Sequence, residues 1–153
     1  IITALPAAVL ASYGGVGHPL TLGPLHAGVS VLALGCGSGV DTLFAAKLTG
    51  SSGKVVGLDL IPEMLQRAKE NLGLAPLDNV TYEQASPDKL PFPDENFDVA
   101  ISNGVINLVP DKAGALSEIF RVLRRAGRLM VADQILIDAL TRDRKQIIKS
   151  WFQ

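Results

Sequence analysis

The chain has 153 residues, 48% hydrophobic and 19% charged, a balance that suits one compact domain with a sizeable core and excludes a disordered chain. Fifteen acidic and fourteen basic side chains leave a formal charge of -1, which argues against nucleic acid or an anionic membrane surface as a partner. With one cysteine, Cys36, and two histidines, we expect no disulfide, no metal site and a cytoplasmic protein.

The first part of the domain, residues 1–28, is expected to be a lead-in of helix and loop. Its apolar residues 1–11 are fewer than the roughly 20 that a membrane-spanning helix needs, and no basic flank precedes them as in a secretory signal. We therefore interpret this segment as a packing helix. The single domain then continues through a ligand-binding core at residues 29–136 and a C-terminal helix within residues 137–153.

From residue 29 onward, short β-rich runs alternate with helical patterns, which is typical of βα units around a mostly parallel sheet. Right-handed crossovers give a doubly wound, Rossmann-like α/β fold with strand order 3-2-1-4-5 and a ligand above the carboxyl ends of strands one and four. The expected strands are residues 29–34, 54–59, 80–84, 97–102 and 128–136. The expected helices are residues 40–48, 62–72 (ended by Gly73), 113–123 and 141–151.

A glycine-rich loop between the first strand and the next helix is the sharpest chemical signal. Glycines let the backbone turn tightly and approach a ligand, and the helix N-terminus offers free N–H groups. Asp59 ends the second strand, where its carboxylate can accept both hydroxyls of a ribose. Loop and carboxylate together predict a nucleoside site. The loop residues are Gly35, Cys36, Gly37, Ser38 and Gly39.

Nicotinamide dinucleotides are the obvious competing ligands for such a loop. Their G-x-G-x-x-G/A fingerprint would place glycine or alanine at position 40, which is Val40 in this chain. The G-x-G-x-G spacing therefore favours another nucleoside cofactor.

Residues 29–136 resemble the class I S-adenosylmethionine-dependent methyltransferases in four ordered motifs: V-L-A-L-G-C-G-S-G, V-V-G-L-D-L-I-P-E-M-L, L-P-F-P-D-E-N-F-D-V-A-I-S-N and R-V-L-R-R-A-G-R-L-M-V-A-D. This resemblance implies S-adenosylmethionine as the cofactor. The family's two strands after the fifth are expected to be missing here. The cofactor-binding residues that the resemblance implies are Gly35, Cys36, Gly37, Ser38, Gly39, Asp59, Leu60, Met64, Ser86 and Asn103.

Within that superfamily, I-S-N-G-V-I-N-L-V-P-D-K at residues 101–112 and G-G-V-G-H-P at residues 14–19 are most similar to arsenite methyltransferases. Ubiquinone and menaquinone methyltransferases are the next most similar. Val16 and Gly104 stand where the arsenite enzymes carry cysteines, and trivalent arsenic is a soft ion that favours thiolates. Arsenite methylation of the usual kind is therefore not expected.

Two acidic positions of the family are also replaced. Ala33 stands where the resemblance implies an acid for the methionine amino group, and Ser86 where it implies one near the adenine amino group. Losing a charged acceptor costs about 1.5–3 kcal/mol. We expect weakened cofactor binding unless Asp41, Asp59 or water compensates.

Methyl transfer demands alignment more than a fixed catalytic triad, so no catalytic residue is assigned. Asn103 at the end of the fourth strand and Asn107 in the adjoining loop are candidates for orienting a substrate, although asparagine also commonly caps helices and turns. His18 is a candidate general base, because an unperturbed imidazole titrates near neutrality.

The leading functional interpretation is methyl transfer from S-adenosylmethionine to a small-molecule acceptor. The alternatives are a noncatalytic module that binds S-adenosylmethionine or another nucleoside, and a truncated methyltransferase domain. An unpaired edge on the fifth strand, residues 128–136, further predicts either a homodimer through that edge or its cover by the last helix.

Overall fold

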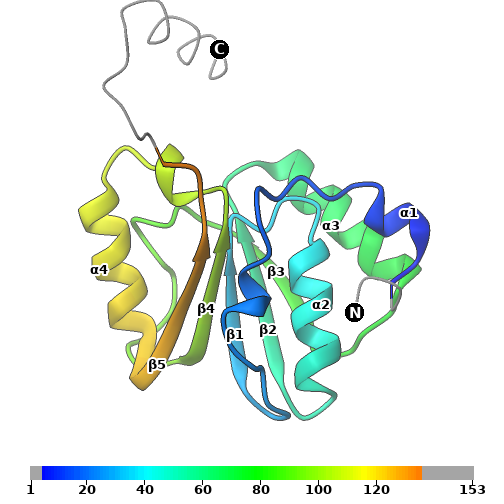
Figure 1. The fold of residues 1–153 in the computed structure, drawn as a ribbon, viewed down its shortest axis with the longest axis horizontal. Helices are drawn as coiled ribbons and strands as arrows, with labels where there is room; N and C mark the ends of the chain where they lie inside the picture. Colours follow the sequence, from blue (N-terminus) through cyan, green and yellow to red (C-terminus); the bar gives the residue numbers. More distant parts are fainter. Residues whose placement is uncertain (1–4, 136–153) are drawn as a thin grey trace, which may run out of the picture.

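The computed structural model describes residues 5–135. Within them, five strands form a single parallel sheet in the order β3-β2-β1-β4-β5 (Figure 1). This confirms the predicted α/β class and the strand order. Every pair of neighbouring strands is parallel, so all carboxyl ends meet at one edge of the sheet. The strands are β1 (Ser30–Leu34), β2 (Lys54–Asp59), β3 (Val80–Gln84), β4 (Phe97–Asn103) and β5 (Leu123–Ala132).

Helices cover both faces of this sheet (Figure 1). One core cluster joins α2 to β1 through Leu43 and Val31, and the other joins α4 to β1 through Ile119 and Leu32. Alternate residues of β1 therefore enter opposite cores, as expected for a central strand. The α-helices are α1 (Ala7–Leu10), α2 (Val40–Thr49), α3 (Pro62–Leu74) and α4 (Lys112–Val122), with short 3-10 turns η2 (Pro19–Thr21) and η3 (Ile106–Leu108).

The predicted end of α3 at Gly73 is wrong, because the helix continues to Leu74. Gly73 does not adopt the left-handed conformation that ends many helices. The stop comes instead at Ala75, which has φ -133° and ψ 70°. Pro76 follows it, and a proline disfavours the helical conformation of the residue before it.

The predicted bounds of the fifth strand, residues 128–136, are also wrong. β5 begins at Leu123, directly after α4, and ends at Ala132. Leu123 pairs with Phe97, and the register then shifts before Arg128 pairs with Val99. Ala126, with φ 61°, lies in this irregular stretch. Arg124 and Arg125, which precede the predicted start of the strand, therefore belong to β5.

The N-terminal packing helix is shorter than expected, since α1 spans only Ala7–Leu10 and buries Val9. The predicted helix at residues 141–151, and all of the C-terminal part at residues 137–153, lie outside the described residues. Within residues 5–135, no helix has the length and apolar character needed to cross a membrane.

Candidate functional site

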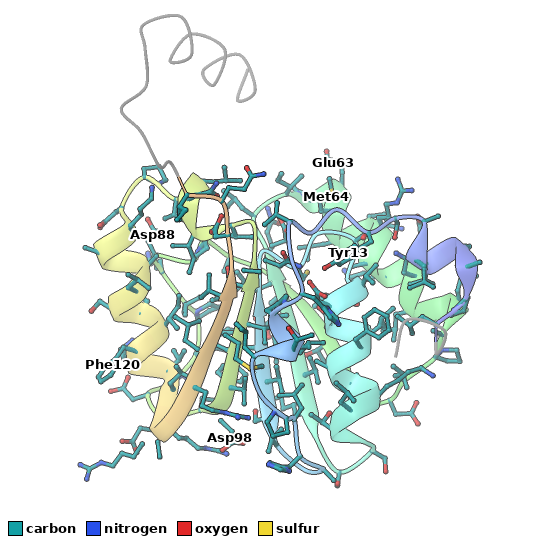
Figure 2. The ribbon with its side chains drawn as sticks, in the orientation of Figure 1. Tyr13, Glu63, Met64, Asp88, Asp98 and Phe120 are labelled. Carbon is teal, nitrogen blue, oxygen red and sulfur yellow. The ribbon has the colours of Figure 1, made fainter. Side chains whose placement is uncertain are left out.

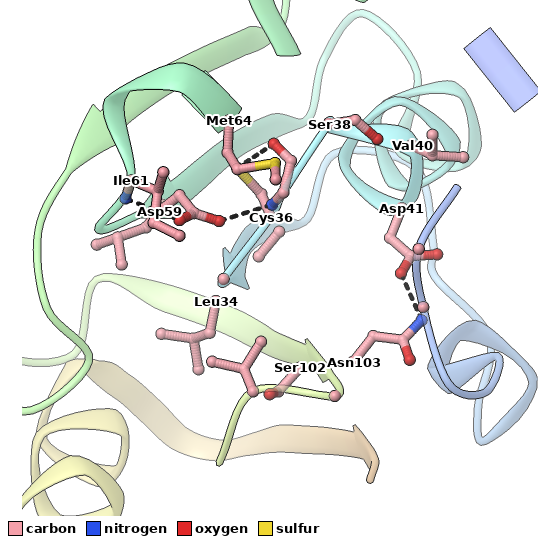
Figure 3. Close-up of a pocket in the computed structure, with 18 of the residues that line it drawn as sticks. Leu34, Cys36, Ser38, Val40, Asp41, Asp59, Ile61, Met64, Ser102 and Asn103 are labelled. Atoms are coloured by element: carbon pink, nitrogen blue, oxygen red, sulfur yellow. Dashed lines mark hydrogen bonds between the residues drawn. The ribbon is translucent and has the colours of Figure 1, made fainter. Parts of the chain in front are cut away.

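A cavity of about 690 Å³ opens above the carboxyl ends of β1, β2 and β4 (Figure 3). This is the point where the order of the strands reverses, and a pocket of this size suits a small organic ligand. All of the cofactor-binding candidates named from the sequence line the cavity except Gly39. Gly39 is the N-cap of α2, and a Cβ there would meet Tyr82 and Ala68.

The glycine loop owes its shape to left-handed backbone conformations, with φ 55° at Gly35 and 53° at Gly37. A Cβ at Gly35 would collide with Val105, so the loop passes close to the residues after β4. A Cβ at Gly37 would meet nothing within 4 Å, which leaves the loop surface open there. Such an open backbone cradle fits close approach by a nucleoside cofactor.

Asp59 holds this loop from the end of β2 (Figure 3). Its Oδ2 accepts the N–H of Gly37 at 2.7 Å, and its Oδ1 accepts the N–H of Ile61 at 3.0 Å. The side chain lines the cavity although Asp59 is only 8% exposed. Because each carboxylate oxygen can accept more than one hydrogen bond, Asp59 retains capacity for ligand hydroxyls.

Cys36 forms part of the cavity wall beside this carboxylate. Burial, and next the negative charge of Asp59, raise the pKa of the Cys36 thiol to about 12. A thiol with so high a pKa stays protonated near neutral pH and is a poor nucleophile. Cys36 is therefore a small wall residue in this site.

Apolar side chains form the rim on the Asp59 side of the cavity. Leu60 is 59% exposed, Ile61 49% and Met64 41%, and all three line the cavity. Ser86 and Pro87, from the loop after β3, line the same cavity. Exposed apolar side chains with one hydroxyl nearby suit the flat, largely apolar face of a purine base.

A polar cluster occupies the other end, built around Asn103 at the end of β4. The Asn103 Nδ2 lies 2.8 Å from Asp41 Oδ2 and 2.7 Å from the Tyr13 hydroxyl, and all three residues line the cavity. Burial raises the pKa of Asp41, against the effect of its hydrogen bond with Asn103. Burial and the nearby charge of Asp41 also raise the pKa of Tyr13.

Asn103 also fastens the segment at residues 12–17 over this end of the cavity. Its Oδ1 accepts the N–H groups of Val16 at 2.9 Å and Gly17 at 3.1 Å. The Tyr13 hydroxyl donates to the Gly17 carbonyl in the same segment. Sequence reasoning singled out Asn103 but missed Tyr13; an aromatic residue directly before two glycines was the available signal.

The candidate general base, His18, and the substrate-orienting candidate Asn107 lie outside the cavity. His18 precedes η2 and packs edge-to-face on Phe44, with ring centroids 6.4 Å apart. Asn107 lies in η3, and its N–H donates to Asp133 Oδ2 at 3.0 Å. Neither lines the cavity with Asn103. Among residues 5–135, no group of three histidine, cysteine or acidic side chains is placed to hold a metal ion.

The residues that depart from the family pattern also lie at this site. Ala33 lines the cavity with a methyl group that accepts no hydrogen bond. Val16 lies beside Gly104, where an added Cβ would come within 3.2 Å of Val16 Cγ1. The fold thus brings together the two positions at which the sequence resemblance implied cysteines, and neither Val16 nor Gly104 offers a sulfur atom.

Comparison with known proteins gives relatives of two kinds. An arsenite methyltransferase of Halobacterium salinarum is 38% identical over 121 residues, which are 79% of this chain and 31% of that protein. The ubiquinone/menaquinone biosynthesis C-methyltransferase UbiE of Cronobacter sakazakii is 44% identical over 108 residues, or 69% of this chain and 43% of that protein.

Comparison with solved structures also finds a methyltransferase. CrArsM, an arsenic(III) S-adenosylmethionine methyltransferase from Chlamydomonas reinhardtii, matches with a TM-score of 0.81 at 34% identity. The match covers 97% of this chain and 52% of CrArsM. The chain thus spans between 31% and 52% of the length of these three proteins. The family model for a methyltransferase domain matches residues 25–153, and the chain therefore belongs to the S-adenosylmethionine-dependent methyltransferase family.

Proposed function

We propose that this chain binds S-adenosylmethionine and transfers its methyl group to a small organic acceptor. One observation carries the proposal: the open glycine loop and the Asp59 carboxylate are hydrogen-bonded to each other at the wall of a single cavity of about 690 Å³. Asp59 offers acceptors for ribose hydroxyls, and the loop offers backbone close to them.

The rim residues support an orientation for the adenosine part. Leu60 and Met64 supply apolar contacts for the base, and the Ser86 hydroxyl supplies one hydrogen bond. Asp59 sits between this rim and the glycine loop and would hold the ribose. The adenosine would then lie over β2, and its substituent would run toward Asp41 and Asn103 at the end of β4.

When bound, S-adenosylmethionine supplies a methyl group on a sulfonium whose leaving group is a neutral thioether. The residues of this chain contribute alignment, which makes an encounter of two molecules effectively unimolecular. Tyr13 and Asn103 offer polar groups that can orient an acceptor, while Val105, Leu108 and Val109 line the cavity with apolar surface. This combination favours an acceptor with one polar nucleophilic group on an apolar body.

Although the chain is similar to arsenite methyltransferases, we do not propose arsenite as its methyl acceptor. Val16 and Gly104 offer no thiolate, and Cys36 is the only cysteine in the chain. Its raised pKa further disfavours a thiolate ligand. We infer that the acceptor is an organic molecule.

Calorimetric titration of the full chain with S-adenosylmethionine, followed by transfer of a labelled methyl group to a panel of small phenols, thiols, amines and arsenite, tests the proposal. We expect saturable binding at one site and transfer to an organic member of the panel. Binding with transfer to none would favour the noncatalytic module. Absence of binding would contradict the proposal, and transfer to arsenite alone would contradict the choice of acceptor.

A further inference from the structure

Asn71 is a buried polar side chain of α3 that does not line the cavity. Asn71 is only 5% exposed, and its Nδ2 donates two hydrogen bonds, to Ser12 Oγ at 2.9 Å and to the Ser38 carbonyl at 2.8 Å. Both hydrogens of this amide nitrogen are thus used. Because Ser12 and Ser38 both line the cavity, Asn71 joins two parts of its wall from outside.

The first of these two parts is the strap, residues 11–17, which follows α1. Residues 11–15 of the strap line the cavity, and Asn103 holds the far end of the strap by accepting two of its backbone N–H groups. α1 packs beside α3, as Figure 1 shows, and this packing brings the start of the strap to Asn71. The strap is therefore fastened at both ends, by one asparagine from α3 and one from β4.

Ser12 and Ser38 complete a closed hydrogen-bond network with Asn71. The Ser12 hydroxyl donates to the Val9 carbonyl at 2.6 Å, which leaves its oxygen to accept from Asn71. The Ser38 hydroxyl donates to the Ser12 carbonyl at 2.7 Å, so the glycine loop and the strap are also bonded directly. The network ties α3, the strap and the glycine loop to one another, and breaking one of its bonds leaves a polar group unpaired.

We propose that Asn71 is a positioning residue for cofactor binding, which holds the strap against the glycine loop in the arrangement that receives the ligand. The inference rests on the proposed function, since it places the cofactor in the cavity that both segments line. Asn71 acts through Ser12 and Ser38. Without its two donors, the strap would be fastened for only part of the time, and the affinity for the cofactor would fall with the fastened fraction.

A merely structural role for Asn71 makes a different prediction. Replacing a buried amide that only stabilises the fold lowers the free energy of unfolding, but the chains that remain folded keep their affinity for the ligand. Asn79 provides the comparison, because its Nδ2 also donates to two backbone carbonyls, those of Ala46 at 3.1 Å and Gly50 at 2.9 Å. Asn79 lies just before β3, at the amino end of that strand, and does not line the cavity.

Calorimetric titration with S-adenosylhomocysteine, at a temperature at which circular dichroism shows each variant folded, separates the two roles. We expect Asn71→Ala to weaken binding by about five- to a hundredfold, because two hydrogen bonds that hold the binding-competent arrangement are lost. Asn79→Ala should lower the melting temperature by a similar amount and change the affinity by less than about twofold. Equal losses of affinity in the two variants, or no loss in Asn71→Ala, would overturn the inference.

Asn71→Asp separates hydrogen bonding from packing, because it keeps the shape of the side chain and removes both donors. The new carboxylate would also face the Ser38 carbonyl, which is itself an acceptor. We expect Asn71→Asp to lose at least as much affinity as Asn71→Ala. An affinity in Asn71→Asp close to that of the parent chain would assign the effect to packing and overturn the inference.

A substitution on the strap guards against Asn71 variants that do not fold. Ser12 is half-buried, and Ser12→Ala removes one acceptor of Asn71 while the Ser38 carbonyl keeps the other hydrogen bond. We expect Ser12→Ala to weaken binding of S-adenosylhomocysteine by about two- to tenfold and to speed hydrogen exchange of the strap amides. An unchanged affinity in Ser12→Ala would overturn the inference alone, whereas no binding of S-adenosylhomocysteine by the parent chain would contradict the proposed function itself.

Discussion

Gly37 donates its backbone N–H to Asp59 Oδ2 over 2.7 Å, so the glycine loop after β1 is tied to the end of β2. The second oxygen of the same carboxylate accepts the N–H of Ile61 at 3.0 Å, just before α3 begins. One side chain therefore fixes the relative positions of two connections that line the cavity. If the proposed function is right, replacing Asp59 should therefore change both cofactor binding and local stability.

Replacing Asp59 with asparagine tests this coupling. An asparagine side chain offers one acceptor and one donor group, so one of the two N–H groups of Gly37 and Ile61 loses its acceptor. We expect the free energy of unfolding to fall by about 1–3 kcal/mol and the affinity for S-adenosylmethionine to fall at least about tenfold. Chemical denaturation and calorimetry measure the two effects. Unchanged affinity in Asp59→Asn would remove Asp59 from the site, and Asp111→Asn is a control at an exposed helix cap.

Gly15 lies where the N-terminal segment meets the end of β4. A Cβ at this position would collide with the side-chain amide of Asn103, whereas a Cβ at Gly14 would meet nothing within 4 Å. We expect Gly15→Ala to lower the free energy of unfolding by about 1–3 kcal/mol through overpacking and also to weaken cofactor binding. Gly14→Ala is the matched control and should leave both nearly unchanged. Equal thermal shifts in the two variants would show that the segment is not held against Asn103.

Cys36 should react slowly with alkylating reagents in the folded chain. Its pKa is raised from 9.0 to about 12, so the thiolate fraction near neutral pH falls about a thousandfold. We expect the rate of modification by iodoacetamide to rise by orders of magnitude in denaturant, and we expect bound S-adenosylhomocysteine to slow it further in the folded chain. A reaction in native buffer as fast as that of a free thiol would contradict this description of the loop.

Glu118 gives the fold a defined dependence on acid. The Arg121 side chain, and next the Leu90 N–H, hold the pKa of Glu118 at about 2, below its ordinary value of 4.5. Because the pKa is lower in the folded state, this contribution to stability is fully present above about pH 4.5 and is lost as the pH falls toward 2. Glu118→Gln should therefore lose less stability than the parent chain across that window in denaturant titrations. The control is Glu63→Gln, which removes an exposed acid of α3 (Figure 2). If the stability of Glu118→Gln falls with decreasing pH as steeply as that of Glu63→Gln, the effect is excluded.

We propose that the chain forms a homodimer through the outer edge of β5. In the described sheet β5 pairs only with β4, and its Leu129 is 36% exposed. Exposed edges are frequently paired or protected by charge, so Leu129→Lys should disfavour edge pairing. We expect light scattering to give twice the monomer mass for the parent chain and a larger monomer fraction for the variant. A monomer at the highest concentration reached would contradict the proposal.

Much of the fold could be predicted because local patterns coincide with its physics. The unbroken apolar run of β1 marks a strand covered on both faces, and the glycine loop marks the turn into α2. The predicted end of α3 and start of β5 were wrong because a local sequence signal was not the one that sets the boundary in the structure. Gly73 is typical of a helix end, but the helix ends one residue later, just before the Ala75-Pro76 pair. The fifth strand was predicted to begin at residue 128, although Leu123 already pairs with Phe97.

Part of the candidate site could be predicted from the sequence and part could not. Asp59 and the glycine loop could be found because they follow the ends of consecutive strands at a characteristic spacing. The cluster of Tyr13, Asp41 and Asn103 could not, because it joins residues 62 to 90 positions apart through side-chain contacts. Hydrophobic periodicity places such residues on elements but carries no information about which distant side chains meet.

A crystal structure of the full chain with S-adenosylhomocysteine tests the central claim most directly, through the distance between the Asp59 carboxylate and the ribose oxygens. Hydroxyl-to-carboxylate hydrogen bonds of about 2.5–3.0 Å, with the thioether chain crossing the glycine loop, are the predicted result. A ligand bound elsewhere, or a ribose beyond hydrogen-bonding reach of Asp59, would contradict it.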